Sequence, residues 1–212
     1  MTKLSVNLNA VAMLRNRRDI GWPSVTGIAR LVLQAGANGI TVHPRPDQRH
    51  IRDSDVGELA AMIREDFPEA EYNIEGYPDQ RFLTLVREAK PDQVTFVPDD
   101  PAQATSDHGW EIEKNSLMLK SAIAEMKDSG FRVVLFADAD DNAPQQAMEV
   151  GADRIELYTG PFAASFGSSQ GEKQLELLAN TAKAAKAVGI GLNAGHDLTL
   201  QNLPAFLGAL PN

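Results

Sequence analysis

The 212-residue sequence predicts an α/β fold, a TIM (β/α)8 barrel of which seven βα units are visible and the eighth is missing. Short β-branched runs alternate with longer amphipathic stretches along the whole chain, which is typical of a parallel sheet covered by helices. Polar residues also occur at the C-terminal end of nearly every expected strand. In a barrel these ends converge on one mouth, where barrel enzymes keep their active sites.

The expected strands are short and apolar. They cover residues 4–8, 39–43, 72–75, 93–97, 132–137, 154–158 and 190–193. Two helix-to-strand junctions nearly repeat, QAGANGITVH at 34–43 and EVGADRIELY at 149–158. In both, glycine ends a helix and a strand begins shortly afterwards.

Helical patterns lie between the strands. We expect a helix that begins near Pro23, one capped by Asp53-Ser54-Asp55, helices over 80–89, 111–129 and 172–188, and one that begins at Asp141-Asn142 before Pro144. For the segment LRNRR, residues 14–18, a solvated turn is the alternative to a binding role, and we expect Arg17 to lie in such a turn. One domain, residues 1–212, therefore accounts for the chain as a C-terminally incomplete barrel.

An open, doubly wound sheet is the competing architecture. It would concentrate function at one switch point, whereas here the polar residues are distributed over nearly all strand ends. No GxGxxG or P-loop follows the first strand, which further favours the barrel. Because a barrel that lacks one unit exposes strand edges, we expect the natural protein to continue beyond Asn212 or another segment to cover that edge.

Composition excludes several classes of protein. The formal net charge of −9 argues against binding to nucleic acid or to an anionic membrane surface. The absence of cysteine excludes disulfides, a thiolate nucleophile and cysteine-ligated zinc. No apolar run is long enough for a signal peptide or a membrane span, so we expect a soluble cytoplasmic protein.

Four titratable residues form the core of the expected mouth: His43, Glu75, Glu156 and His196. In a half-buried cavity, the pKa values of two imidazoles and two carboxylates can be shifted apart, so that one group acts as a base and another as an acid near neutral pH. The same four groups suit a divalent metal ion, but no tight HxH or HxxxE spacing is present, so a metal site ranks second. No lysine follows a strand, which argues against a Schiff base to the enzyme.

Arginines near the strand ends are candidates for binding phosphate, because the guanidinium fork matches phosphate oxygens. Arg45 follows the second strand, and Arg15 and Arg18 follow the first. The long loops 98–111 and 160–171 are candidate lids over the mouth, and His108 in the first of them is expected to be solvated.

Six motifs in order resemble the pyridoxine 5′-phosphate synthase family of vitamin B6 biosynthesis. They are LSVNLNAVAMLRNRR, GITVHPRPDQRHI, YNIEG, QVTFVPDDPAQATSDHG, RIELYTG and LNAGHDLTLQNL, and they extend from Leu4 to about Leu203. The combination of VHPRxDxRHI with NAGHDL makes the resemblance specific. It implies a TIM barrel that condenses 1-deoxy-D-xylulose 5-phosphate with 3-amino-2-oxopropyl phosphate, with no cofactor and no required metal.

The resemblance also implies roles for individual residues. His43 and Glu75 would be proton acceptors, His196 a proton donor, and Glu156 would stabilise a transition state. The amino-ketone phosphate would be held by Asn7 and Arg18, and the deoxyxylulose phosphate by Arg45, His50 and Thr105. The family forms homo-oligomers, octamers, and its partners are small phosphorylated substrates.

The sequence departs from the family pattern in three places. Asn9-Ala10 stands where many members have Asp-His, and Asn9 is the candidate to replace that sugar contact. Asp197 follows His196 where many members have glycine, and we count it among the substrate contacts. The eighth strand of the family, with its phosphate-binding Gly-His element, does not follow the seventh unit here.

We expect the position of the proton donor His196 to depend on the turn Asn193-Ala194-Gly195-His196-Asp197. We expect Gly195 to let the backbone bend, and Asp197 to cap a helix over 198–207. Two other functions remain open from the residues alone: a metal-assisted aldolase or epimerase acting on a phosphosugar, and a catalytically inactive barrel that only binds phosphate ligands.

Overall fold

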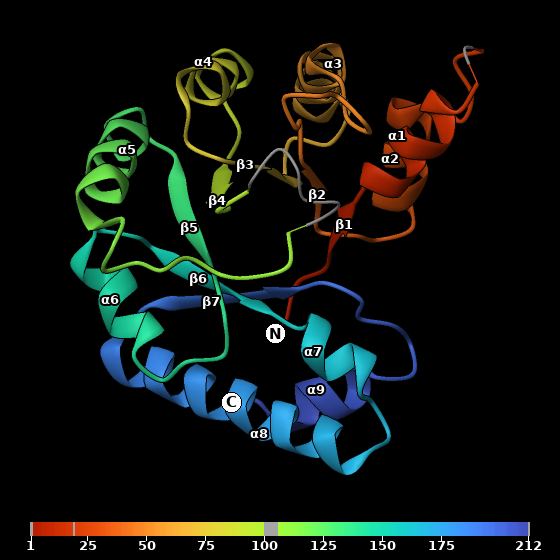
Figure 1. Cartoon of the computed structure of the whole chain (residues 1–212). Helices are drawn as coiled ribbons and strands as arrows, with labels where there is room; N and C mark the ends of the chain where they lie inside the picture. The colour runs from red at the N-terminus through yellow and green to blue at the C-terminus, as the bar shows by residue number, and fades with distance from the viewer. Residues whose placement is uncertain (1, 19, 100–105, 212) are drawn as a thin grey trace. The chain divides into compact units, whose positions relative to one another are not determined.

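The structure is a computed structural model that describes residues 2–18, 20–99 and 106–211. Within these residues seven strands and nine helices alternate along the chain (Figure 1). The strands are β1 (Ser5–Asn7), β2 (Gly39–Val42), β3 (Glu71–Gly76), β4 (Gln93–Phe96), β5 (Arg132–Ala137), β6 (Arg154–Tyr158) and β7 (Gly191–Gly195). All seven predicted strands are confirmed, each to within two residues at either end.

The helices follow the strands in the expected order, with two additions. They are α1 (Asn9–Asn16), α2 (Val25–Gln34), α3 (Asp53–Asp66), α4 (Gln80–Ala89), α5 (Ser116–Asp128), α6 (Ala143–Glu149), α7 (Gly160–Ala164), α8 (Ser169–Val188) and α9 (Leu203–Ala209). Helix α4 has the predicted bounds, whereas α5 begins five residues later than predicted. Helix α1 includes residues 14–16, for which a solvated turn was the alternative, and α7 lies inside a segment that we expected to be a loop.

Two compact units make up the chain. The first contains β1, β2, β3 and most of β4, which are neighbours in that order. Strands β1, β2 and β3 are parallel, with Asn7 opposite Thr41 and Val42 opposite Ile74. Helices α2, α3 and α4 lie along one side of these strands (Figure 1). Parallel neighbours joined by helices in sequence order are what a (β/α) barrel requires, and a doubly wound sheet would reverse this order.

The second unit contains β6, β7 and nearly all of β5, again neighbours in sequence order. Both pairings are parallel, with Glu156 opposite Phe136 on one side and opposite Asn193 on the other. The twenty-residue helix α8 packs beside β7 and contacts α6, α7 and α9 (Figure 1). Its ends follow local rules: the Ser168 hydroxyl accepts a hydrogen bond from the Gly171 amide, and Gly189 ends the helix at φ 79°.

A chain of polar side chains runs across the four strands of the first unit. The hydroxyls of Ser5 and Thr41 are 2.8 Å apart, the Asn73 amide donates to Thr41 (3.3 Å), and the Thr95 hydroxyl donates to Asn73 (3.1 Å). Thr41, Asn73 and Thr95 are all buried. Buried polar groups are costly unless they pair, so this chain favours one alignment of the four strands.

Helix α1 forms because its last turn has partners far away in the sequence. Arg15 makes a buried ion pair with Asp55, and the Asn16 side chain bonds main-chain oxygens of residues 48–50. These contacts are long-range, so no local pattern indicates them. Arg15 is therefore buried, whereas Arg17 is exposed as predicted.

Gly39 allows β2 and β3 to approach closely. A Cβ added at Gly39 would lie 2.5 Å from the carbonyl oxygen of Glu71, a main-chain atom that cannot move without shifting β3. We expect Gly39→Ala to lower the free energy of unfolding by about 2–3 kcal/mol through overpacking. Urea denaturation measures the change.

The matched control is Gly57→Ala inside α3, where an added Cβ meets nothing within 4 Å. The free energy of unfolding of that variant should rise by about 0.5–1 kcal/mol, because alanine is the better helix former. Equal effects at the two glycines would show that the close approach at Gly39 does not matter for stability.

Candidate active site

Three site candidates lie at one level, in or just beyond the C-terminal ends of the first three strands. Asn9 follows Asn7 by two residues, His43 follows Thr41 by two, and Asn7 and Thr41 are paired in the parallel register. The Asn9 side-chain oxygen accepts a hydrogen bond from the His43 amide (2.9 Å). Glu75 comes directly after Ile74, which pairs with Val42, so Glu75 and His43 continue the same register. The structure thus places Asn9, His43 and Glu75 at the same end of three neighbouring strands.

Asp99 connects His43 to a further candidate, Arg45. One oxygen of its carboxylate lies 3.0 Å from Nε2 of His43 and 2.7 Å from Nη1 of Arg45. The side chains are deeply buried, with 7% of His43, 2% of Arg45 and 7% of Asp99 exposed. The sequence analysis missed Asp99, because nothing local distinguishes it from the other aspartates of the same loop.

His50 is held as a neutral imidazole with a defined tautomer. Burial lowers its pKa to about 4, and the nearby His43 and Arg45 add to the effect. The Ile51 amide donates to Nδ1 of His50 (2.9 Å), so Nδ1 accepts and the ring proton is on Nε2. The His50 ring is 5.8 Å from that of His43. His50 can therefore present an N–H donor beside the candidate base.

The remaining candidates near β1 differ in their surroundings. Asn7 is exposed, and its side-chain oxygen accepts a hydrogen bond from the Asn9 amide (2.8 Å). Arg18 is exposed just after α1, which leaves it accessible to a ligand. Arg15, which we considered as a phosphate ligand, is instead buried against Asp55. Thr105 lies outside the described residues.

In the second unit, Glu156 is buried at the middle of β6. Only 8% of the residue is exposed, and burial raises the pKa of its carboxyl group to about 7. A Cβ added at Gly195 would lie 2.9 Å from Oε1 of Glu156, so a larger residue at this position would require the carboxyl group to shift. Gly195 thus lies close to the carboxyl group of Glu156.

His196 follows β7 with an unusual backbone. Its φ is 84° and that of Asp197 is 56°, whereas Gly195 has no positive φ, so our expectation that glycine supplies the bend was wrong. The Thr159 hydroxyl bonds the carbonyl oxygens of Gly195 and His196, and the Thr159 amide donates to the former (3.0 Å). Thr159 therefore stabilises the strained turn.

The imidazole of His196 packs between aromatic rings. The Phe136 ring is 5.4 Å away, and the Tyr158 ring is 5.2 Å away in an edge arrangement. Asp197 does not cap a helix at 198–207 as we expected. The helix is α9, which begins at Leu203, and the Asn202 side chain donates to the Asp197 carbonyl (3.1 Å).

The two candidate lids contain ordered contacts. In the first, residues 106–110 are held by Trp110, whose indole donates to the Phe96 carbonyl (2.9 Å) and whose amide donates to that of Phe136 (3.0 Å). His108 is exposed beside Asp107, as predicted. The second contains α7, where Gly160 packs against the Tyr158 ring.

Among residues 2–18, 20–99 and 106–211, no three His, Asp or Glu side chains are grouped so that they could hold a metal ion. No helix in the same residues is long and apolar enough to cross a membrane.

Parallel βα units in sequence order, with candidate acid–base residues in or just after the strands, are the arrangement of a (β/α)-barrel enzyme. Solved structures agree on the fold. The HMG-CoA lyase from Brucella melitensis is similar with a TM-score of 0.64 at 14% identity, covering 98% of this chain and 78% of that one. An aldolase, QR15, gives a TM-score of 0.58 at 11% identity, with 98% and 86% covered.

The chain belongs to the family described as pyridoxal phosphate biosynthesis protein PdxJ, whose model matches residues 4–212. It is 59% identical over 210 residues to the pyridoxine 5′-phosphate synthase of Mesorhizobium japonicum, covering 99% of this chain and 85% of that protein. The corresponding proteins of Chelativorans sp. and Brucella abortus are 57% and 55% identical, with 99% of this chain and 86% and 85% of theirs covered.

Glu156 should make stability depend on pH. Its pKa is raised from 4.5 to about 7, so the folded state binds a proton more tightly than the unfolded state, and stability falls as pH rises from about 4.5 through 7. Glu156→Gln removes this titration. As pH rises from 5 to 8, the free energy of unfolding of the variant should increase by about 2–3 kcal/mol relative to that of the wild type. Urea denaturation at each pH measures this difference.

Glu149→Gln, at an exposed position of α6, is the control and should show no such trend. A constant difference between Glu156→Gln and the wild type from pH 5 to pH 8 would mean that Glu156 ionises as an ordinary carboxyl group.

Proposed function

We propose that this chain condenses 1-deoxy-D-xylulose 5-phosphate with 3-amino-2-oxopropyl phosphate to give pyridoxine 5′-phosphate, phosphate and water. Relatives that are 55–59% identical are pyridoxine 5′-phosphate synthases, and enzymes of this kind act on phosphorylated small molecules. The observation that carries the proposal is the group around His43. A candidate base, a buried arginine and a neutral imidazole donor meet within one compact unit.

His43 and Glu75 are the proposed proton acceptors. The carboxylate of Asp99 on Nε2 of His43 favours the tautomer that carries a proton there, which leaves the lone pair on Nδ1 for proton abstraction. Arg45 and His50 are the proposed contacts to the sugar phosphate, through a guanidinium and an imidazole N–H. The amine arrives on a substrate, and its condensation with a carbonyl group releases water, so the enzyme needs no lysine of its own.

Asn7 and Arg18 are the proposed contacts to the amino-ketone phosphate, and both are exposed. We keep Asn9 as a candidate sugar contact, although its side-chain oxygen already accepts a hydrogen bond from the His43 amide. Thr105 remains a candidate for the sugar phosphate by resemblance, and Asp197 remains one because it follows His196.

In the second unit, Glu156 is the proposed charge-stabilising group and His196 is the proposed acid. With a pKa of about 7, the carboxyl group of Glu156 is about half protonated near neutral pH, so it can donate a hydrogen bond to a developing negative charge. His196 is the proposed proton donor to the hydroxyl group that leaves as water. By resemblance to the family we also propose a cytoplasmic homo-oligomer, an octamer, that requires no metal ion or cofactor.

Removal of either proposed base should abolish product formation without unfolding the protein. His43→Ala and Glu75→Gln should each lower turnover by about two to four orders of magnitude, because a positioned base contributes that much. Product formation by this chain is measured by absorbance or mass, and folding by circular dichroism. The control is His108→Ala, which removes an exposed imidazole and should leave turnover near that of the wild type.

Near-normal turnover in a folded His43 or Glu75 variant would remove that residue from the mechanism. A wild-type chain that binds phosphate ligands but forms no product would instead support an inactive, ligand-binding barrel.

His196→Asn should separate binding from chemistry. Asparagine keeps polarity and tolerates positive φ, so the turn held by Thr159 should persist while the acid is lost. We expect near-normal affinity for both substrates, a turnover lower by about two to four orders of magnitude, and an intermediate that accumulates before the ring becomes aromatic. Single-turnover absorbance and mass measurements test this, and weak binding with unchanged chemistry would make His196 a binding residue.

A further inference from the structure

The last turn of α1 holds the main chain that carries His50. The Asn16 amide nitrogen lies 2.7 Å from the carbonyl oxygen of His50, 3.2 Å from that of Arg49 and 3.3 Å from that of Gln48. Nη2 of Arg15 donates to the same His50 oxygen at 3.3 Å. Two consecutive side chains of one helix therefore bond the residue that is proposed to contact the sugar phosphate.

The orientation of the Asn16 amide is itself determined by Arg15. Both Nε and Nη2 of Arg15 donate to the side-chain oxygen of Asn16, at 3.1 Å and 2.9 Å. With its oxygen turned toward the guanidinium, the amide must direct its nitrogen toward the carbonyl groups of residues 48–50. A flipped amide would place its N–H groups against a cation and its oxygen against three carbonyl oxygens.

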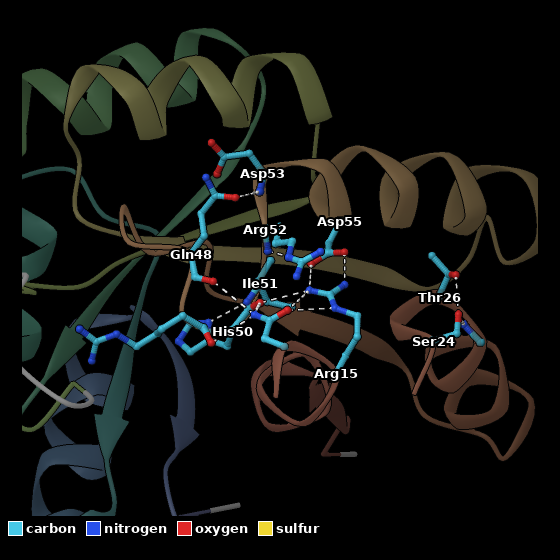
Figure 2. Close-up of polar contacts among 12 residues, drawn as sticks. Arg15, Ser24, Thr26, Gln48, His50, Ile51, Arg52, Asp53 and Asp55 are labelled. Carbon is cyan, nitrogen blue, oxygen red and sulfur yellow. Dashed lines mark hydrogen bonds and ion pairs between the residues drawn. The ribbon is translucent and has the colours of Figure 1, made fainter. Parts of the chain in front are cut away.

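Arg15 is fixed in turn by a buried, two-pronged ion pair with Asp55, one bond of which measures 2.9 Å (Figure 2). The other oxygen-to-nitrogen contact joins Nη1 of Arg15 to Asp55 Oδ1. The carboxylate also accepts a hydrogen bond from the Arg52 amide at the start of α3 (2.7 Å). The arginine side chain is only 10% exposed, so its role lies inside the protein rather than with a ligand.

The imidazole at the end of this network has little freedom left. The carbonyl oxygen of His50 is held by Arg15 and Asn16, and its Nδ1 accepts from the Ile51 amide. What remains for a ligand is the N–H group on Nε2, whose direction is set by the main chain. An ordered donor loses less entropy on binding than a mobile one.

We infer that Arg15 and Asn16 are positioning residues for the sugar-phosphate subsite, which hold the main chain at His50 so that its Nε2–H donates to the phosphorylated sugar. This inference rests on the proposed function through the role of His50. It predicts a defect selective for one of the two substrates, which a general loss of structure would not produce.

Asn16→Ala tests the inference directly, because it removes the donor to the three carbonyl groups. We expect the KM for 1-deoxy-D-xylulose 5-phosphate to rise about tenfold, which corresponds to the loss of about one hydrogen bond. The KM for 3-amino-2-oxopropyl phosphate should change less than about twofold, and kcat less than about threefold. Calorimetric titration of the folded variant with the sugar phosphate should show the same loss of affinity without turnover.

The matched control is Asn115→Ala. Its side-chain amide also donates to a main-chain carbonyl group, that of Glu111 (2.9 Å), but in the second unit. Neither KM should change in this variant. Arg15→Lys is the second test: lysine keeps the positive charge next to Asp55 but loses the planar fork, so it should repeat the selective rise in KM.

An unchanged KM for the sugar phosphate in folded Asn16→Ala would overturn the inference. So would equal changes for both substrates, or loss of the fold in both Asn16→Ala and Arg15→Lys, since either result indicates a purely structural role. Failure of the proposed function looks different, because the wild-type chain would then form no pyridoxine 5′-phosphate at all.

Discussion

The parallel register of the first three strands is the constraint on which the site depends. Asn7 pairs with Thr41 and Val42 with Ile74, so the residues at the C-terminal ends of these strands lie at a common level. A slip of two residues would separate the row of Asn9, His43 and Glu75, and a slip of one would turn alternate side chains to the other face. The buried polar chain from Ser5 to Thr95 opposes both slips, because any shift would leave its donors and acceptors unpaired.

Burial shifts the pKa values of two site residues in opposite directions and favours the neutral form of both. Removal from water disfavours the charged form of any group, so the pKa of His50 falls to about 4 and that of Glu156 rises to about 7. Both groups thus tend toward neutrality, and both can then donate a hydrogen bond. Near neutral pH His50 is a permanent donor, whereas Glu156 is divided between donor and carboxylate. Burial therefore produces both protonation states, because it acts on a base in His50 and on an acid in Glu156.

Three arginines that follow the first two strands have different roles because their surroundings differ. Arg18 is exposed beyond the end of α1, Arg45 is buried on Asp99, and Arg15 is buried on Asp55. A buried guanidinium must have an anionic or polar partner, and the identity of that partner decides the role. With Asp55 and the His50 carbonyl as partners, Arg15 becomes part of the support for the subsite rather than a ligand-binding group.

The sequence by itself determined the order of the βα units and the residues at the strand ends. Strand positions follow from short β-branched runs bounded by glycine and turn residues, and the placement of His43, Glu75 and His196 follows from counting to the ends of those runs. The shared motifs also pointed to the family that the comparisons then showed. These are local properties, readable from neighbouring residues.

Only the tertiary structure decided which side chains support that site. The pairs Arg15–Asp55 and Arg45–Asp99 join residues 40 and 54 positions apart, and Glu156 and Gly195, which also lie close together, are far apart in the sequence as well. The positive φ of His196 likewise depends on Thr159, a residue of another strand's end. The physical reason is that burial and partner choice depend on which distant segments the fold brings together, whereas residue type and spacing report only what each segment can do.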